Sequence, residues 1–326
     1  MKRAVFKRVA TAVAVGGMIF IFLFDIAAVL LSNRWQANYP VTPEAFDGGW
    51  GRTRIHFLNT GNSDCILLES AGRFALVDAG WGSDNPNKSA ADREGSEARV
   101  LDYLKRAIAD ENGMVKLDFV LPTHYHYDHA GGFPLILADP AIQVGTVYLS
   151  PRDGQAHRHD LETRRRIEEI STARGFAIEE DIPIAPFQFG DVTLQFLNTE
   201  QGGRNENDNS IVTLLTYGDF RALLAADVTA LHGHEQKLAR EIGPVDLLKL
   251  PHHGYAMSSS AAFLRALRPK AAVVTNIYGK VYPNVMWNLA MVSRTALLSS
   301  VRDDGLIVTI TDKGEIQATA HLQMEE

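Results

Sequence analysis

The chain has 326 residues, 46% of them hydrophobic, and a formal net charge of −7. This length and apolar content are enough for a large buried core in one domain or two. Cys65 is the only cysteine, which excludes an intrachain disulfide and a cysteine-rich zinc finger.

An apolar run from Val9 to Leu31 lies near the start of the sequence, interrupted by small residues and Asp25. As a helix it is long enough to cross a hydrocarbon layer of ~30 Å, which takes about 20 residues. Four basic residues precede it: Lys2, Arg3, Lys7 and Arg8. We therefore predict that residues 1–31 form a cytoplasmic flank and a transmembrane signal anchor, with the rest of this single-pass protein outside the cytoplasm. The alternatives are a cleaved signal peptide, giving a secreted protein, and a helix buried in a soluble domain.

The part of the chain beyond this segment is more acidic than the total charge suggests. Residues 1–31 contribute +3, so the remainder carries −10. Such a domain lacks the broad basic surface of a tight nucleic-acid binder, and we expect no stable complex with nucleic acid.

Residues 32–53 are polar, with prolines and glycines, which predicts a linker. From residue 54 to residue 326 the pattern is that of one α/β domain, with short strands and amphipathic helices. Strands are predicted over 54–58, 64–70, 74–78, 117–121, 144–149, 192–197, 211–217, 221–226, 246–250, 271–275, 306–310 and 315–320. Helices are predicted over 96–109, 160–174, 231–242 and 261–267.

A histidine-rich loop follows the fourth of these strands and reads Thr-His-Tyr-His-Tyr-Asp-His-Ala-Gly-Gly over residues 123–132. Imidazole and carboxylate groups are ligands for zinc and similar divalent ions. Residues two apart on an extended loop point the same way, so His124 and His126 can share one ion. Asp128 and His129 can address a second. The alternative is a surface loop, but a cluster of this density favours a metal site, and the two glycines allow a close backbone approach.

This loop resembles the His-x-His-x-Asp-His motif of the metallo-β-lactamase superfamily, and three further stretches resemble that family's motifs in order. Residues 75–80 resemble its strand ending in Asp-x-Gly. Residues 223–227 resemble the strand that delivers a bridging aspartate, and residues 248–254 (Leu-Lys-Leu-Pro-His-His-Gly) resemble the last ligand motif. The resemblance implies a four-layer αββα sandwich over residues 54–326.

Three features are similar to one branch of that superfamily. They are the Pro-His-His-Gly form of the last motif, residues 207–210 (Asn-Asp-Asn-Ser) and residues 56–65. This branch contains the nuclease-like domain of DNA-uptake channel proteins and the phosphorylcholine esterases of bacterial surfaces.

The resemblance implies a centre of two divalent ions, with Zn²⁺ as the first choice and Mn²⁺ as the alternative. The implied ligands are His124 and His126 for the first ion, Asp128, His129 and His252 for the second, and Asp227 as the bridge between both. Asp128 and Asp227 would also take part in catalysis, around a hydroxide that the two metals share.

Other residues would support the centre or contact the substrate. Asp78 would fix a ligand histidine, and His253 would stand behind its neighbour as a supporting or substrate-contacting group. Many family members have a further histidine where this chain has Asn198. Either Asn198 and water complete the coordination of the first ion, or the first ion is bound more weakly. The remaining candidates are Asn209, Ser210, Lys280 and Tyr282.

The function predicted from these features is that of a membrane-anchored, metal-dependent hydrolase, in the first place a phosphodiesterase. Its substrate would be a surface polymer, a lipid head group or nucleic acid. One alternative is a β-lactamase or lactonase that acts on a carbonyl. Another is a non-catalytic component of DNA uptake or surface assembly.

Overall fold

The computed structural model describes residues 53–83, 95–151, 158–200 and 202–322, residue 324, and scattered positions between residues 13 and 42. The predicted anchor, residues 1–31, and most of the predicted linker therefore lie largely outside the described residues. Within the described part of the chain, we find no helix with the length and apolarity needed to span a membrane.

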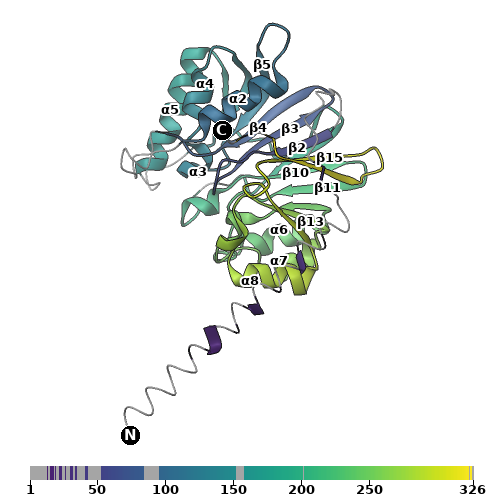
Figure 1. Cartoon of the computed structure of the whole chain (residues 1–326). Helices are drawn as coiled ribbons and strands as arrows, with labels where there is room; N and C mark the ends of the chain where they lie inside the picture. Colours follow the sequence, from purple (N-terminus) through teal and green to yellow (C-terminus); the bar gives the residue numbers. More distant parts are fainter. Residues whose placement is uncertain are drawn as a thin grey trace.

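The first of two mixed sheets holds nine strands and is built mainly from the first half of the domain (Figure 1). Adjacent strands from β2 to β4 pair antiparallel, and adjacent strands from β4 to β7 pair parallel. In spatial order the strands are β1 (Val41–Thr42), β16 (Ile316–Ala320), β15 (Leu306–Ile310), β2 (Thr53–Phe57), β3 (Cys65–Ser70), β4 (Arg73–Ala79), β5 (Val115–Leu121), β6 (Ile142–Tyr148) and β7 (Ala177–Glu179). Strand β1 falls within the predicted linker and pairs with β16 at the edge of this sheet.

The second sheet holds seven strands from the second half of the domain. Here β8 to β11 are antiparallel and β11 to β14 are parallel. In spatial order the strands are β14 (Ala296–Ser299), β13 (Ala271–Val274), β12 (Leu247–Lys249), β11 (Phe220–Leu224), β10 (Val212–Tyr217), β9 (Val192–Leu197) and β8 (Phe187–Phe189).

Both faces of each sheet are covered, so central strands are apolar on both sides. In β4, Ala75 and Val77 belong to the core between the sheets, while Leu76 belongs to the core beneath the outer helices. In β11, Leu224 faces the other sheet and Leu223 faces helices. This arrangement explains why these strands read as continuous apolar runs, because alternation disappears when neither face meets water.

Helices cover the outer face of each sheet and complete four layers (Figure 1). The nine-stranded sheet carries α2 (Glu97–Ile108), α4 (Phe133–Ala138) and α5 (Arg158–Arg174). The seven-stranded sheet carries α6 (His234–Ile242), α7 (Ala261–Leu267), α8 (Pro283–Trp287) and the π-helical turn η5 (Asn288–Ser293). The predicted αββα sandwich is confirmed.

The predicted elements agree with the structure to within a few residues, with two kinds of difference. The helix expected from residue 231 begins at His234, because Gly233 takes a left-handed conformation (φ 88°) that ends the preceding turn. The short elements β7, β8, β14, α4 and α8 were not predicted, because they contain too few residues for a periodic pattern.

Candidate metal centre

The histidine-rich loop leaves the end of β5 and is fixed to the end of the neighbouring strand β4. Thr123 donates hydrogen bonds to both oxygens of Asp78, from its backbone N (2.8 Å) and from Oγ1 (2.8 Å). The loop then enters the short helix α3 (Tyr127–Ala130), which carries Asp128 and His129. The local fold thus places three histidines and one carboxylate above the ends of two parallel strands.

The glycines after the loop are required by close packing, as their sequence suggested. A Cβ added to Gly132 would lie 2.1 Å from the carbonyl oxygen of Ala79, and one added to Gly131 would lie 2.8 Å from the backbone N of Gly82. Any side chain here would push the loop away from β4, and the histidines would move with it.

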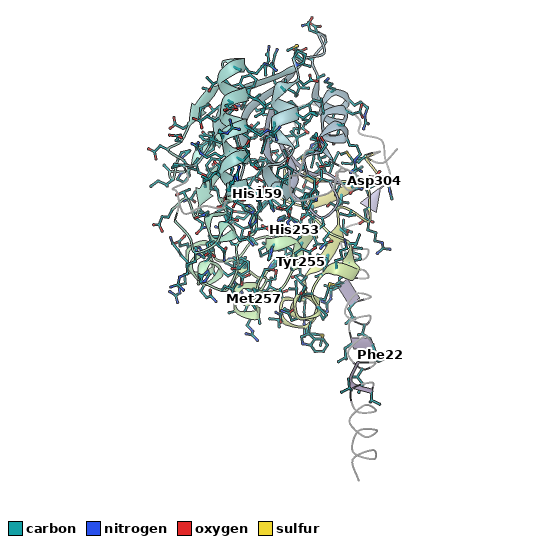
Figure 2. The ribbon with its side chains drawn as sticks, turned by 90° about the vertical axis from the view of Figure 1, so that its left-hand side faces the viewer. Phe22, His159, His253, Tyr255, Met257 and Asp304 are labelled. Atoms are coloured by element: carbon teal, nitrogen blue, oxygen red, sulfur yellow. The ribbon has the colours of Figure 1, made fainter. Side chains whose placement is uncertain are left out.

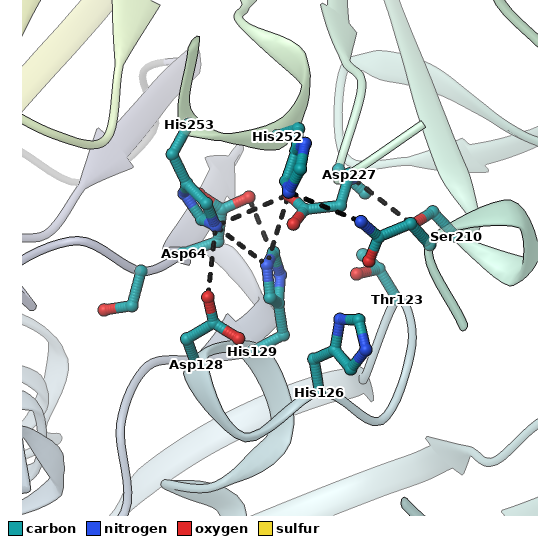
Figure 3. A network of polar contacts seen from close by, with 12 residues as sticks. Asp64, Thr123, His126, Asp128, His129, Ser210, Asp227, His252 and His253 are labelled. Carbon is teal, nitrogen blue, oxygen red and sulfur yellow. Dashed lines mark hydrogen bonds and ion pairs between the residues drawn. The ribbon is translucent and has the colours of Figure 1, made fainter. Parts of the chain in front are cut away.

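Four residues from four segments converge at the rim between the sheets: Asp64, His129, Asp227 and His253 (Figure 3). One potential ligand atom from each lies within 4.8 Å of the others, and all four residues are buried. Asp64 precedes β3, His129 follows β5, and Asp227 and His253 follow β11 and β12. The predicted meeting of strand ends from both sheets is therefore present.

Oδ1 of Asp227 is the centre of this group. It lies 3.2 Å from Nε2 of His129 and 3.5 Å from Nε2 of His253, and those two nitrogens are 3.1 Å apart. Among the described residues, none donates a hydrogen bond to this buried oxygen. A buried carboxylate oxygen without a donor, facing two imidazole nitrogens, fits a cation.

The outward contacts of the two rings fix which nitrogen is available. Nδ1 of His129 lies 2.7 Å from Asp78, whose carboxylate can only accept, so Nδ1 carries the proton. Thr275 donates its hydroxyl hydrogen to Asp64 (2.6 Å), so its oxygen accepts from Nδ1 of His253 (3.0 Å). With the proton held on Nδ1, each ring can present Nε2 to a metal ion, the arrangement in which a neutral histidine binds metal.

The charges of the site explain the pKa shifts of its members. Burial disfavours the charged form of both rings, but Asp227 and Asp78 raise the pKa of His129 well above its ordinary value. Asp227 and Asp64 do the same for His253, again against the effect of burial. Burial would raise the pKa of Asp227, yet the two histidines hold it well below its usual range. The site thus favours the ionised form of Asp227 and attracts positive charge, whether protons or a metal ion.

The other predicted ligands of the loop surround this group. Oδ2 of Asp128 lies 3.4 Å from Nε2 of His253. Nε2 of His124 lies 3.1 Å from Nδ1 of His126, and the rings of His124 and His129 are 4.1 Å apart between centroids. The structure therefore brings His124, His126 and Asp128 beside the four central residues.

The sequence favoured His252 over His253, whereas the structure places His253 in the central group. Both residues have left-handed backbone conformations (φ 52° and 50°) in the turn η3 (Pro251–Gly254). This turn directs the two rings differently: His253 is buried against Asp64, and Nε2 of His252 lies 3.4 Å from the amide Nδ2 of Asn207. Consecutive left-handed residues other than glycine are costly, and such strain gathers at functional sites.

A buried lysine, Lys249, lies beneath the centre. It forms an ion pair with Asp64, donates a hydrogen bond to the carbonyl of Ala226 (3.0 Å) and lies 3.8 Å from Oδ1 of Asp227. Burial would raise the pKa of Asp64, but Lys249 and His253 lower it below its ordinary value. Because Lys249 and Thr275 already engage its oxygens, Asp64 is better suited to orient His253 than to bind an ion.

Two of the residues predicted from the sequence, Asn198 and Asn209, stabilise the loop between β9 and β10. The Asn198 amide donates to the carbonyls of Asp208 (3.0 Å) and Ser210 (2.8 Å). Oδ1 of Asn209 accepts from the backbone N of Gly203 (2.8 Å).

The remaining three predicted residues differ in their distance from the centre. Oγ of Ser210 accepts from the backbone N of Asp227 and lies 3.5 Å from Nδ1 of His124. Lys280, in the turn η4 (Tyr278–Lys280), is exposed, and Tyr282 is 46% exposed. These two residues lie on the same loop, outside the central group of four.

Asp64, Lys249 and Thr275 were not proposed as site residues from the sequence. Lys249 did leave a signal, since it is the one charged residue in the apolar strand Leu247-Leu248-Lys249-Leu250. A lysine at a fully buried strand position needs a carboxylate partner. Neither Asp64 nor Thr275 could be identified as that partner or its neighbour without the packing of the two sheets.

The fold and the site define the class of protein. The family model of the metallo-β-lactamase superfamily matches residues 58–275, which is more than half of the chain, and the chain belongs to that superfamily. It is a metallo-β-lactamase-fold domain with a buried His/Asp cluster suited to a metal ion.

Its curated relatives are larger proteins. Competence protein ComA of Neisseria gonorrhoeae is 26% identical over 228 residues, which are 69% of this chain and 27% of that protein. Recombination protein 2 of Haemophilus influenzae is 27% identical over 229 residues, 68% of this chain and 24% of that protein. The chain therefore corresponds to about a quarter of the length of these relatives. The resemblance found in the sequence is confirmed for the superfamily and for a distant homology to competence proteins.

Solved structures with a similar arrangement share little sequence. The metallo-β-lactamase fold protein YhfI from Bacillus subtilis is 14% identical with a TM-score of 0.48, over 76% of this chain and 96% of that chain. Zn²⁺-bound PqqB from Methylobacterium extorquens is 14% identical with a TM-score of 0.45, over 75% of this chain and 86% of that chain.

Proposed function

We propose that this protein is a metal-dependent hydrolase of phosphodiesters, held at a membrane by its N-terminal segment. The observation that supports this most directly is Oδ1 of Asp227, which is buried without a hydrogen-bond donor among the described residues and faces Nε2 of both His129 and His253. The ligands would be His129, Asp227, His253 and Asp128 at one position and His124 and His126 at a second, with Zn²⁺ or Mn²⁺ bound.

Bound divalent ions would supply an activated water and neutralise negative charge on a phosphoryl oxygen. The protein's own contribution is the arrangement of the donors. Asp78 keeps the Nδ1 proton of His129 in place, and Thr275 does so for His253. Lys249 adds one fixed positive charge under the centre, which offsets the charge of Asp64.

Turnover of the soluble ester bis(p-nitrophenyl) phosphate tests the proposal. The full chain, purified in detergent and loaded with Zn²⁺ or Mn²⁺, should hydrolyse it, and a chelator should stop the reaction. Asp227→Asn should lower kcat/KM by more than about 100-fold, because it removes a ligand and a charge. Asp191→Asn, at an exposed residue of the β8–β9 hairpin, is the matched control and should behave as wild type.

The alternatives predict different results. Hydrolysis of nitrocefin without hydrolysis of the phosphodiester would favour a β-lactamase or lactonase. The relative named Competence protein ComA favours, as a second candidate, a non-catalytic component that retained the fold. Stoichiometric metal binding with no turnover of either substrate would support that candidate against ours.

A further inference from the structure

The described residues of the N-terminal segment are apolar and exposed until the segment reaches the domain. Val13 is 70% exposed, Ile19 55% and Phe22 65%, whereas Leu31 is 1% exposed. Leu31 packs into the apolar core beneath α7, α8 and η5. Arg34 donates a hydrogen bond to the carbonyl of Ala290 in η5 (2.8 Å). The end of the apolar segment is thus attached to the helical layer of the seven-stranded sheet, while Val13, Ile19 and Phe22 remain uncovered.

The same layer carries a group of exposed apolar side chains. We call this group the α8 rim; its members are Leu231, Met257, Trp287 and Met291, which are 54%, 57%, 42% and 51% exposed. Trp287 and Met291 are four residues apart on a continuous helical stretch, so they share a face.

Backbone and side-chain contacts hold the members of the rim together. The backbone N of Ala230 donates to the carbonyl of Met257 (2.7 Å), which places Leu231 next to Met257. Asn288 donates to the carbonyl of Ser259 (3.2 Å), which ties η5 to the segment that carries Met257. The rim is therefore one patch on neighbouring elements.

This rim lies beside the candidate metal centre. The ring of His252 is 5.6 Å from that of Tyr255, and Tyr255 is 6.3 Å from Tyr282, the residue just before α8. In Figure 2, His253 and Tyr255 lie above Met257, Met257 lies toward the lower end of the domain, and Phe22 lies below that end. A surface that contacted both the rim and the N-terminal segment would therefore pass close to Tyr282 and Tyr255, which connect the rim to His252.

We propose that the α8 rim inserts into the interface of a phospholipid bilayer, and that the site acts on the phosphodiester of a lipid head group. This inference rests on the proposed function and names its substrate class. A bilayer is the occupant that can cover the apolar segment and the rim together, because both are exposed at the same layer of the domain. Tryptophan and tyrosine side chains at such a boundary are typical of membrane interfaces. Exposed Lys280 and Arg294 flank the rim, where they can meet lipid phosphates.

Quenching of tryptophan fluorescence by brominated phosphatidylcholine tests the docking surface. With the full chain in nanodiscs of this lipid, the Trp287→Phe variant should show substantially less quenching than wild type. The control Trp81→Phe, in the loop after β4, should be quenched to the same extent as wild type. Equal quenching in wild type and Trp287→Phe would overturn the proposal, as would a stable dimer in which Trp287 is shielded from lipid.

A comparison of two substrates tests the substrate class. Trp287→Glu with Met291→Glu should lower cleavage of phospholipid head groups in bilayers by at least about tenfold, because charge opposes insertion of the rim. The same variant should keep wild-type turnover of soluble bis(p-nitrophenyl) phosphate. Leu135→Glu, at an exposed residue of α4 in the opposite helical layer, is the control and should leave cleavage of the lipid unchanged.

The outcomes separate this inference from the proposed function. Turnover of the soluble ester together with absent or unaffected cleavage of lipid would reject the inference and leave the phosphodiesterase in place. Failure to hydrolyse the soluble ester under any metal would reject the proposed function itself.

Discussion

The Nζ atom of Lys249 forms an ion pair with Asp64, and the two residues come from different sheets. Lys249 is the last residue of β12 in the seven-stranded sheet, and Asp64 lies immediately before β3 in the nine-stranded sheet. Both side chains are almost completely buried. The pair therefore joins the sheets directly beneath the candidate metal centre.

We expect Lys249→Met to destabilise the protein strongly. It leaves the carboxylate of Asp64 buried without its ion-pair partner, which costs about 3–5 kcal/mol in comparable pairs. Urea unfolding in the presence of a chelator measures this cost without a contribution from bound metal. The double variant Lys249→Met with Asp64→Asn should recover part of the lost stability, since the uncompensated charge is gone. A loss in the double variant equal to the sum of the losses in the two single variants would show that the two residues are not coupled.

The two adjacent histidines after β12 should contribute unequally to metal binding. His253→Ala should weaken Zn²⁺ binding by more than about 100-fold, because it removes an imidazole nitrogen from the centre. His252→Ala should have a smaller effect, since Nε2 of His252 lies near Asn207. Zinc titration with a competing chelator compares them, with the exposed His159→Ala as a control. A larger loss in His252→Ala would reverse our assignment.

Asp78 should act on the metal through His129. In Asp78→Asn the amide can present its NH₂ to Nδ1 of His129, which favours the tautomer with the proton on Nε2, the atom needed for the metal. We expect metal affinity to fall about 10–100-fold, as is usual when such a partner is lost. Asp118→Asn, at a half-exposed position of β5, provides a control for carboxylate removal. Unchanged affinity in Asp78→Asn would contradict this role.

A second buried network should make the fold sensitive to acid. Nδ1 of His56 lies 2.7 Å from the hydroxyl of Tyr103, and Nε2 lies 3.1 Å from Glu69. Burial lowers the pKa of His56 below 6.5, although Glu69 opposes the shift. Below pH ~6.5 the unfolded chain binds a proton at His56 that the folded protein does not. Stability therefore decreases as the pH is lowered, until the pH reaches the pKa of His56 in the folded protein.

The slope of stability against pH checks this expectation. Unfolding free energies between about pH 7 and pH 5 should decrease by at most about 1.4 kcal/mol per pH unit from this residue. His56→Gln should flatten the decrease, and His159→Gln should leave it unchanged. Identical slopes in wild type and His56→Gln would show that His56 is not the group responsible.

The sequence by itself determined the elements of the fold and the main donors of the site. Strands and helices could be predicted because apolar periodicity is a local property. The loop from His124 to His129 indicated a metal site because its candidate ligands are neighbours in the chain. The four-layer fold was implied by the resemblance of the motifs to those of the metallo-β-lactamase superfamily, and the Asp-x-Gly end of β4 and Asp227 were each correctly placed at a strand end.

Only the tertiary structure decided how these strand ends complete one another. His252 and His253 are chemically identical neighbours, and the left-handed turn of η3 buries the ring of His253 against Asp64 while it places Nε2 of His252 near Asn207. Asp64 and Lys249 are 185 residues apart, and each has a local context that reads as part of an ordinary strand. Their pairing depends on the packing of one sheet against the other, which places two charges in a common low-dielectric interior where neither is stable alone.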